Sequence, residues 1–299
     1  METLTNKWQP QVIVLGPGGV KGFLLLGCLK RLTQDTFLEK INHWVGVSAG
    51  AAIALLLVCG LKVDEIISIC FEIDLVEDVL AINLDESGKR LGLLQNKTVE
   101  TKMEKCIKNK YGYIPNLEQL FVMTGLELTM VTFNIDAMEP VYLHHNTHGQ
   151  LSCVEAAMMS MAVPLLMQPR KYNGQAYIDG ALGAPYPVCR FDDLDVLGLY
   201  ISSEIDLYSA YKKPITFIYK LVQSGIKRLR EIEIEHCSDK VKHISLKTEI
   251  TDTTGIALSR DAKQAMIDSG YQCGERFLAR LENPYQIELS ATDEFSFEE

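Results

Sequence analysis

The chain has 299 residues, of which 47% are hydrophobic and 23% charged, and its formal net charge is −10. This size and composition are typical of a globular protein with a large core, within the range of one α/β domain. The acidic excess argues against nucleic acid as the main partner. It also disfavours adhesion of the whole molecule to anionic lipid, although a local basic patch could still bind.

Eight cysteines are scattered along the chain without a C-x-x-C pair, which disfavours a metal knuckle or a redox motif. Apolar surroundings favour buried free thiols and a reducing compartment. The first seven residues contain no hydrophobic segment, so no secretory signal is expected. The uncharged run over 45–61 is broken by glycines and barely long enough for a membrane span, which favours a buried strand, turn and helix. We expect a cytoplasmic or peripheral membrane protein.

The N-terminal part of the chain alternates between strands and helices. Residues 11–15 form an apolar strand that ends at a glycine-rich loop, and helical spacing of apolar residues follows over 19–32. A second strand over 44–47 leads into an alanine- and leucine-rich helix over 48–59. This alternation implies a parallel sheet covered by helices.

The rest of the chain continues the mixed pattern without a linker, repeat or low-complexity tract. Residues 62–124 combine helix and loop, and the strand over 126–135 is expected to pair with 140–143. An acidic tail over 293–299 is expected to fray. The other expected elements are helices over 154–161, 215–233 and 261–281 and strands over 194–202 and 241–246.

A G-x-S-x-G pattern, Gly46-Val47-Ser48-Ala49-Gly50, joins the second strand to its helix. In that context a serine hydroxyl stands on a sharp strand-to-helix turn, where flanking glycines relieve crowding. The positive end of the following helix would stabilise negative charge that develops there. The alternative is a serine that caps the helix between two packing glycines, and the five residues alone leave both interpretations open.

The glycine-rich loop, Gly16 to Gly22, has three interpretations. The spacing fits neither the dinucleotide fingerprint nor the P-loop. Backbone amides of Gly18, Gly19 and Val20 could instead form an oxyanion hole, where one donor is worth on the order of 10²–10³ in rate. Lys21 would then fix the loop or attract an anionic headgroup. The remaining interpretation is a plain strand-to-helix turn.

The base that would activate Ser48 is the discriminating residue. A conventional triad would use a late histidine, but His236 and His243 lie in charged surroundings. Asp179, followed by Gly180, is the better candidate, because an aspartate at a strand end can present its carboxylate to a cleft. Its basicity would have to be raised by burial. The alternative is an Asp-Gly hairpin turn.

Three further histidines, at positions 144, 145 and 148, cluster after the strand over 140–143. Histidines are common metal ligands, but no carboxylate or cysteine nearby in the sequence completes a ligand pattern. We therefore expect a solvated turn and no metal.

These residues resemble the patatin-like phospholipases, serine lipid hydrolases that use a Ser–Asp dyad. The likeness covers nearly the whole chain in the right order. One departure is Ala184 before Pro185, where many members carry asparagine. The matching segments are Gly18–Gly22 with the family's G-G-x-[RK]-G motif, Gly46–Gly50 with its nucleophile elbow, Asp179–Ala181 with its D-G-[GA] block, 155–164 with the helix and proline turn that shape its cleft, and 261–281 with its closing helix.

The resemblance implies a three-layer α/β/α fold around a mostly parallel sheet, in one domain. Its core spans about 10–205 and a helical C-terminal region about 206–285. Ser48 would attack a fatty acyl ester of a glycerophospholipid, Asp179 would accept the proton, and the loop amides would stabilise the oxyanion, with no metal or organic cofactor. The supporting residues would be Lys21, Gly22, Gly46, Gly50 and Gly180.

Two other functions stay open: a catalytically silent lipid-binding or storage protein on the same fold, and an α/β-hydrolase that uses His236 or His243. The helix over 215–233 is amphipathic and bears basic residues, so it could meet a membrane interface. The alternative is a surface helix that packs its apolar face on the core. The apolar residues of this face are Phe217, Ile218, Leu221, Val222, Gly225, Ile226 and Leu229.

Overall fold

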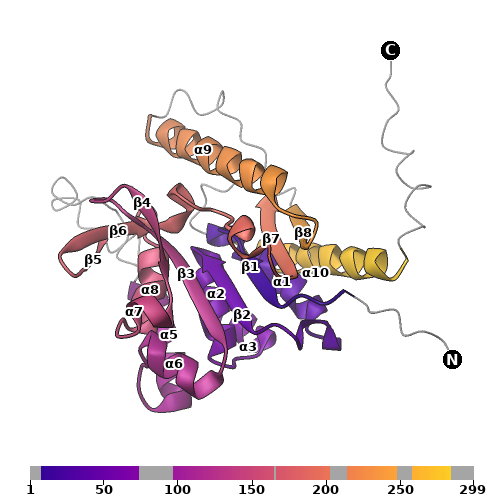
Figure 1. Ribbon diagram of the computed structural model, residues 1–299, viewed down its shortest axis with the longest axis horizontal. Coiled ribbons are helices and arrows are strands. Elements are labelled where there is room, and N and C mark those ends of the chain that lie inside the picture. Colours follow the sequence, from indigo (N-terminus) through magenta and orange to yellow (C-terminus); the bar gives the residue numbers. More distant parts are fainter. Residues whose placement is uncertain (1–7, 74–96, 165, 203–213, 248–257, 284–299) are drawn as a thin grey trace.

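The computed structural model describes residues 8–73, 97–164, 166–202, 214–247 and 258–283 (Figure 1). The strands are β1 (Val12–Leu15), β2 (His43–Val47), β3 (Glu127–Asn134), β4 (Glu139–Leu143), β5 (Arg170–Tyr172), β6 (Gln175–Asp179), β7 (Val196–Ser202) and β8 (Val241–Lys247). The helices are α1 (Gly22–Leu32), α2 (Ala49–Val58), α3 (Val63–Glu72), α5 (Lys97–Tyr111), α6 (Leu117–Thr124), α7 (His145–His148), α8 (Cys153–Ser160), α9 (Pro214–His236) and α10 (Arg260–Glu282).

All eight strands form one mixed sheet, in the order β5-β6-β3-β2-β1-β7-β8, with β4 also paired to β3. The contiguous block from β3 through β2, β1 and β7 to β8 is parallel, whereas β4, β5 and β6 add antiparallel pairs at one side. In a parallel sheet the loops after the strands all emerge at one edge. The residues that follow β1 and β2 are therefore neighbours at the carboxyl end of the sheet.

Helices cover both faces of the sheet, because successive side chains of each strand point to opposite sides. In β1, Ile13 and Leu15 face the larger core, which is filled by residues of α1, α2, α8 and α10. Val12 and Val14 face a smaller core that includes Tyr186 and residues near the end of α9. Figure 1 shows α9 on one side of the sheet and α1, α2 and α10 on the other. The three-layer arrangement predicted from the sequence is confirmed.

The expected elements are present with shifts of a few residues at their ends. Residues 19–21 form a 3-10 turn that precedes α1, where one continuous helix was expected. The expected turn over 145–148 is one short helix, α7. Asp179 does not form a hairpin turn; the turn of the β5–β6 hairpin is Asn173-Gly174, with φ of +50° and +81°. Positive φ at both positions is the pattern of a two-residue hairpin.

The acidic tail over 293–299 and the seven N-terminal residues lie outside the described residues. Among the helices that are described, none combines the length and the apolar character that a membrane crossing requires.

Candidate active site

Ser48 occupies the turn between β2 and α2 in a strained backbone conformation, with φ +57° and ψ −125°. Non-glycine residues rarely adopt positive φ, and such strain concentrates at functional sites. The turn closes only because its neighbours lack side chains. A Cβ at Gly46 would lie 2.4 Å from the Ala51 Cα, and one at Gly50 only 2.2 Å from the Leu15 carbonyl oxygen.

The buried side chain of Ser160, at the end of α8, supports this turn. Its hydroxyl accepts a hydrogen bond from the Ser48 amide at 2.9 Å and donates one to the Val131 carbonyl at 2.5 Å. Ser48 itself caps no helix amide. Its hydroxyl is therefore not used in the capping role that the sequence left open.

Asp179 reaches Ser48 through the register of β3. Val131 pairs with Val47, the last residue of β2, and the next residue, Thr132, pairs with Asp179, the last residue of β6. Because β4 occupies the other edge of β3 at these positions, β2 and β6 share one edge and meet end to end. The turn that carries Ser48 and the end of β6 that carries Asp179 thus lie beside consecutive residues of β3.

Asp179 is 3% exposed, and its carboxylate accepts a hydrogen bond from the Ala181 amide at 2.9 Å. Burial raises the pKa of Asp179 to about 6, and the Ala181 amide and the nearby Ser48 hydroxyl moderate that rise. Gly180 is required at the next position, since an added Cβ would lie 2.2 Å from the Val131 carbonyl oxygen. A buried carboxylate with raised pKa accepts a proton more readily than a free aspartate does.

The glycine-rich loop lies beside this pair. Leu15 of β1 pairs with Gly46 of β2, so the loop and the serine turn leave neighbouring strands at the same end. A Cβ on Gly22 would be 3.5 Å from that of Ala49. In the loop, the Lys21 amide donates to the Gly18 carbonyl and the Gly22 amide to that of Gly19.

The amides of Gly18, Gly19 and Val20 come just before those two hydrogen bonds, at the N-terminal end of the 3-10 turn. Backbone amides at such an end have no intrahelical partner. Gly19 has φ +50° and open space around its Cα, so it forms the tip of the loop. Lys21 is buried, and that burial lowers the pKa of its ammonium group. Its side chain is part of the loop's support, whereas the tip faces outward.

The late histidines have other partners. His236 is exposed at the end of α9 and contacts the Ile232 carbonyl. His243 lies in β8, where its Nδ1 is 2.9 Å from the Tyr186 hydroxyl. Neither makes a contact with Ser48 or Asp179 in the part of the chain that the structure describes. The geometry of a Ser-His-Asp triad is not formed by either residue.

Comparison with known proteins identifies the family. The family model for patatin-like phospholipases matches residues 13–191, which is more than half of the chain. The chain belongs to the patatin-like phospholipase family. The segment contains both Ser48 and Asp179, and the sequence-based expectation of a lipid acyl hydrolase is confirmed at this level.

Two viral proteins are similar to this patatin-like protein. An uncharacterised protein, R571, of Acanthamoeba polyphaga mimivirus is 28% identical over 88% of this chain and 90% of its own length. A probable lipid hydrolase, 463L, of invertebrate iridescent virus 6 is 27% identical over 60% of this chain and 62% of its own.

Two solved structures share the fold of this patatin-like protein. VipD from Legionella pneumophila superposes with a TM-score of 0.60 at 14% identity, covering 91% of this chain and 67% of VipD. The type III effector ExoU superposes with a TM-score of 0.53 at 16% identity, covering 92% of this chain and 53% of ExoU. At such identities the likeness concerns the fold.

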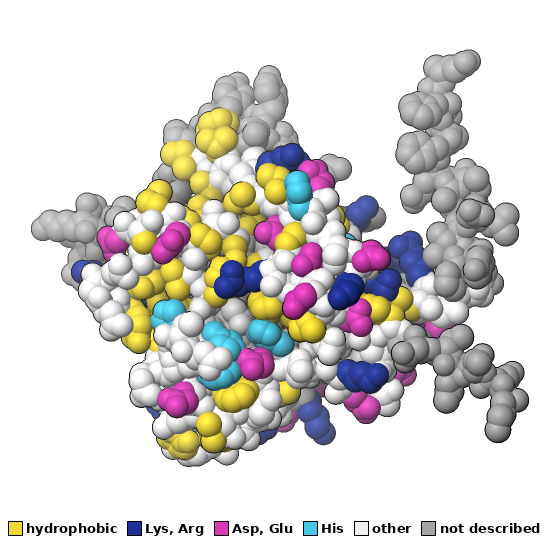
Figure 2. Space-filling view, in the orientation of Figure 1, with side chains coloured by type: hydrophobic (Ala, Val, Ile, Leu, Met, Phe, Trp, Pro, Cys, Tyr) yellow, Lys and Arg dark blue, Asp and Glu magenta, His cyan; other side chains and the backbone are white. Residues whose placement is uncertain are grey.

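Helix α9 borders the candidate site of this patatin-like protein. Ile226 packs on a small cluster that contains Val47 and Val131, and Tyr219 lies close enough for the Asp179 charge to raise the pKa of its phenol further, after burial. The face expected from the sequence is therefore divided. Ile226 faces the core, whereas Ile218 and Leu221 are 48% and 53% exposed. Figure 2 shows hydrophobic side chains gathered on the surface below α9.

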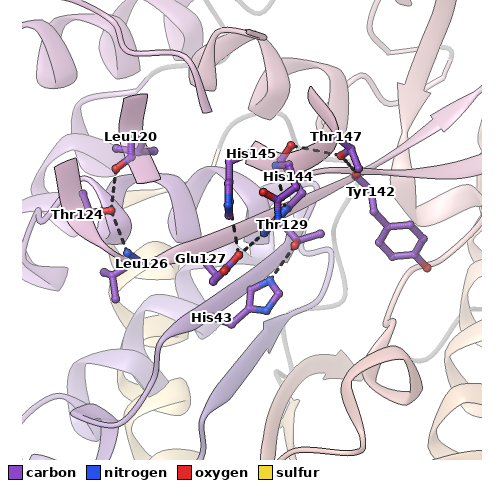
Figure 3. A network of polar contacts seen from close by, with 11 residues as sticks. His43, Leu120, Thr124, Leu126, Glu127, Thr129, Tyr142, His144, His145 and Thr147 are labelled. Carbon is purple, nitrogen blue, oxygen red and sulfur yellow. Dashed lines mark hydrogen bonds and ion pairs between the residues drawn. The ribbon is translucent and has the colours of Figure 1, made fainter. Parts of the chain in front are cut away.

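The fold brings to the histidine cluster a carboxylate that is distant from it in the sequence. Glu127, at the start of β3, contacts His144 Nε2, and His145 Nδ1 lies 3.5 Å from the same carboxylate oxygen (Figure 3). His43, at the start of β2, joins them. Sequence reasoning missed this group because β2, β3 and the β4–α7 junction bring together residues that are far apart in the chain. His148 is not among the three residues whose ligand atoms converge.

Proposed function

We propose that this protein hydrolyses fatty acyl esters of glycerophospholipids with a Ser48–Asp179 dyad. The observation that carries the proposal is that the strained turn of Ser48 and the buried Asp179 lie beside consecutive residues of β3, with the pKa of that carboxylate raised to about 6. At neutral pH that carboxylate is ionised and can take the hydroxyl proton. A serine on a strained turn with a base in contact is the arrangement that nucleophilic catalysis requires.

In the proposed reaction, Ser48 Oγ attacks the ester carbonyl while Asp179 accepts its proton. Amides of Gly18, Gly19 and Val20 stabilise the oxyanion, aided by the positive end of α2, whose first turn contains no acidic residue. Asp179 then donates the proton to the departing alcohol, which leaves an acyl-enzyme on Ser48. Water then attacks that ester while Asp179 accepts its proton, and Asp179 returns the proton to the departing Ser48 oxygen as the fatty acid is released.

Phospholipid is the proposed substrate, and α9 is the proposed contact with the lipid surface. Ile218 and Leu221 are exposed on the helix whose inner face borders the site, and Lys227 and Arg228 follow them along the same helix. An amphipathic helix with basic residues binds an anionic interface through burial of its apolar side chains and through attraction of its basic residues to the lipid headgroups. A lipid held there would have its ester close to Ser48.

The test is the release of fatty acid from phospholipid vesicles by four proteins: wild type, Ser48→Ala, Asp179→Asn and a double His236→Gln/His243→Gln variant. We expect Ser48→Ala to lose on the order of 10⁴-fold or more, and Asp179→Asn about 10²–10⁴-fold. The double histidine variant should keep near-wild-type activity. Melting temperatures of all four proteins control for folding.

Two outcomes would reject the dyad: near-full activity of Asp179→Asn, or loss of activity in the histidine variant alone. A fluorophosphonate probe separates the enzyme from a silent lipid-binding protein. It should label wild type at Ser48 and leave Ser48→Ala unlabelled. A folded wild type that neither reacts with the probe nor releases fatty acid would be the binding protein.

A further inference from the structure

We propose that His43, Glu127 and His144 form a binding site for a divalent transition metal, with Zn²⁺ the best match, at the amino end of the sheet. One ligand atom from each of these three side chains lies within 4.8 Å of the others. Imidazole nitrogen and carboxylate oxygen are ligands that zinc accepts in proteins. The site is distinct from the candidate active site and does not depend on the proposed hydrolase mechanism.

The three ligands come from elements that the sheet holds in fixed register. His43 begins β2 and pairs with Glu127, which begins β3. His144 directly follows β4, whose last residue, Leu143, pairs with Met130 of β3. Tetrahedral zinc with bonds of about 2.0–2.1 Å holds its ligand atoms about 3.3 Å apart.

Neighbouring side chains already orient the rings. The Thr129 hydroxyl lies 2.8 Å from His43 Nε2. His145 stacks on Phe121, with ring centroids 3.8 Å apart and planes 4° from parallel. Such outer contacts fix ligand rings in metal sites and contribute strongly to affinity.

His145 supplies a further observation that points to a ligand. Within the described residues its buried Nδ1 makes no hydrogen bond, and it lies 3.5 Å from a Glu127 carboxylate oxygen in an ion pair (Figure 3). A buried polar atom without a hydrogen bond is unfavourable. His145 is not among the three residues whose ligand atoms converge, so water would complete the shell of the metal. Histidine side chains are visible on this face of the molecule beside an acidic group, so an ion can enter from solvent (Figure 2).

The metal would join the starts of two parallel strands to the β4–α7 junction. His43 is five residues before Ser48 along β2, which is about 16 Å at the rise of a strand. At that distance the ion does not contact the ester. We therefore assign the metal a structural role, as a link between strands at the amino end of the sheet.

The test uses full-length protein stripped with EDTA and titrated with ZnCl₂, followed by calorimetry and by thermal melting. We expect one equivalent of Zn²⁺ to bind wild type and to raise its melting temperature by several degrees. Glu127→Gln and His144→Gln should each bind at least tenfold more weakly and lose the shift. His148→Gln is the matched control, because this nearby histidine is outside the ligand group, and it should behave as wild type.

Co²⁺ absorption of wild type supplies a readout that needs no variant. We expect the weak visible bands of nitrogen and oxygen ligands, without the intense thiolate band that cysteine coordination produces. Burial raises the pKa of Cys59 to about 12 and that of Cys70 to about 11, so these thiols compete poorly. The site is disproved by a thiolate spectrum, by an unchanged melting temperature of wild type, or by equal Zn²⁺ affinity in wild type and His144→Gln.

Discussion

The two ends of the central sheet carry polar clusters that are built in different ways. At the carboxyl end, Ser48 and Asp179 are almost completely buried, the serine has a positive φ, and glycines make room for the turn. At the amino end, His43 and Glu127 begin ordinary strands, and the Glu127 side chain is 34% exposed. Strain and burial accompany the reactive pair, whereas the histidine group needs neither.

This difference follows from the chemistry that each end performs. A serine hydroxyl becomes a nucleophile only when a base is held against it, and an isolated carboxylate becomes a better base when water is removed. Both conditions cost stability. A metal site needs only correctly spaced lone pairs, which strand register provides without distortion.

We expect the largest effect at the carboxyl end of the sheet from replacing Gly50 by alanine. The new Cβ would lie 2.2 Å from the Leu15 carbonyl oxygen, a backbone atom that cannot move without shifting β1. We expect a loss of about 3 kcal/mol or more in the free energy of unfolding, together with loss of esterase activity. Chemical denaturation measures the first and fatty-acid release the second.

Gly225→Ala in α9 is the matched control, because no atom lies within 4 Å of its added Cβ. In a helix this change should stabilise the protein by about 0.5–1 kcal/mol. Equal stability of the two variants would show that the serine turn is no more constrained than a surface helix.

Removing the charge of Asp179 should stabilise the protein. Its pKa is about 6 in the folded state against an ordinary value of 3.8, so below about pH 4 both states are protonated and the group has no effect. Between about pH 4 and 6 the unfolded carboxyl ionises while the folded one stays protonated, so stability falls, by a total on the order of 3 kcal/mol that is complete above pH 6. Urea unfolding at pH 8 should therefore find Asp179→Asn more stable than wild type by that order. A less stable variant at pH 8 would contradict the burial penalty.

The same ionisation sets the pH dependence of the reaction. Because Asp179 must be deprotonated to accept the serine proton, kcat/KM on a soluble ester should fall about tenfold per pH unit below 6 and level off above it. Initial rates measured from about pH 4.5 to about pH 8, in steps of about half a pH unit, give the midpoint of this pH dependence. A midpoint near 7 that disappears in the His236→Gln/His243→Gln variant would assign the base to histidine instead.

The smallest effect concerns lipid binding. Ile218→Ser and Leu221→Ser together should weaken binding to anionic vesicles by about tenfold without changing the melting temperature, since both side chains are largely exposed. The control is Val122→Ser in α6, at the amino end, where the side chain is 77% exposed. Co-sedimentation with vesicles measures both. An equal loss of vesicle binding in the two variants would mean that vesicles do not bind preferentially at the carboxyl end of the sheet.

Local motifs made much of the carboxyl end predictable from the sequence. The serine turn and the glycine loop each depend on residues that are adjacent in the chain, and alternation of apolar runs predicted the strands that carry them. The contact between Ser48 and Asp179 was expected only through the family resemblance. Its physical origin, the shared edge of β3, depends on pairing that no local pattern encodes.

The amino end was not predictable in the same way. Glu127 was treated as part of a strand, and His43 was not singled out at all. Their proximity follows from the register that pairs His43 with Glu127, two residues that are 84 positions apart in the chain (127 − 43). The division of α9 into an inner and an exposed apolar face also depends on where the helix lies, because both faces have helical spacing in the sequence.

The end-to-end meeting of β2 and β6 has a consequence for how the enzyme would fail on heating. In the described part of the chain the β5–β6 hairpin pairs with β3 at three positions, Thr132 with Asp179, Phe133 with Ile178 and Asn134 with Tyr177, and β5 is an edge strand. Elements with few pairings open locally at lower free energy than the whole molecule. Release of this hairpin would carry Asp179 away while Ser48 stayed on its turn. Thermal inactivation would then precede loss of the core, in a chain that still has most of its native sheet.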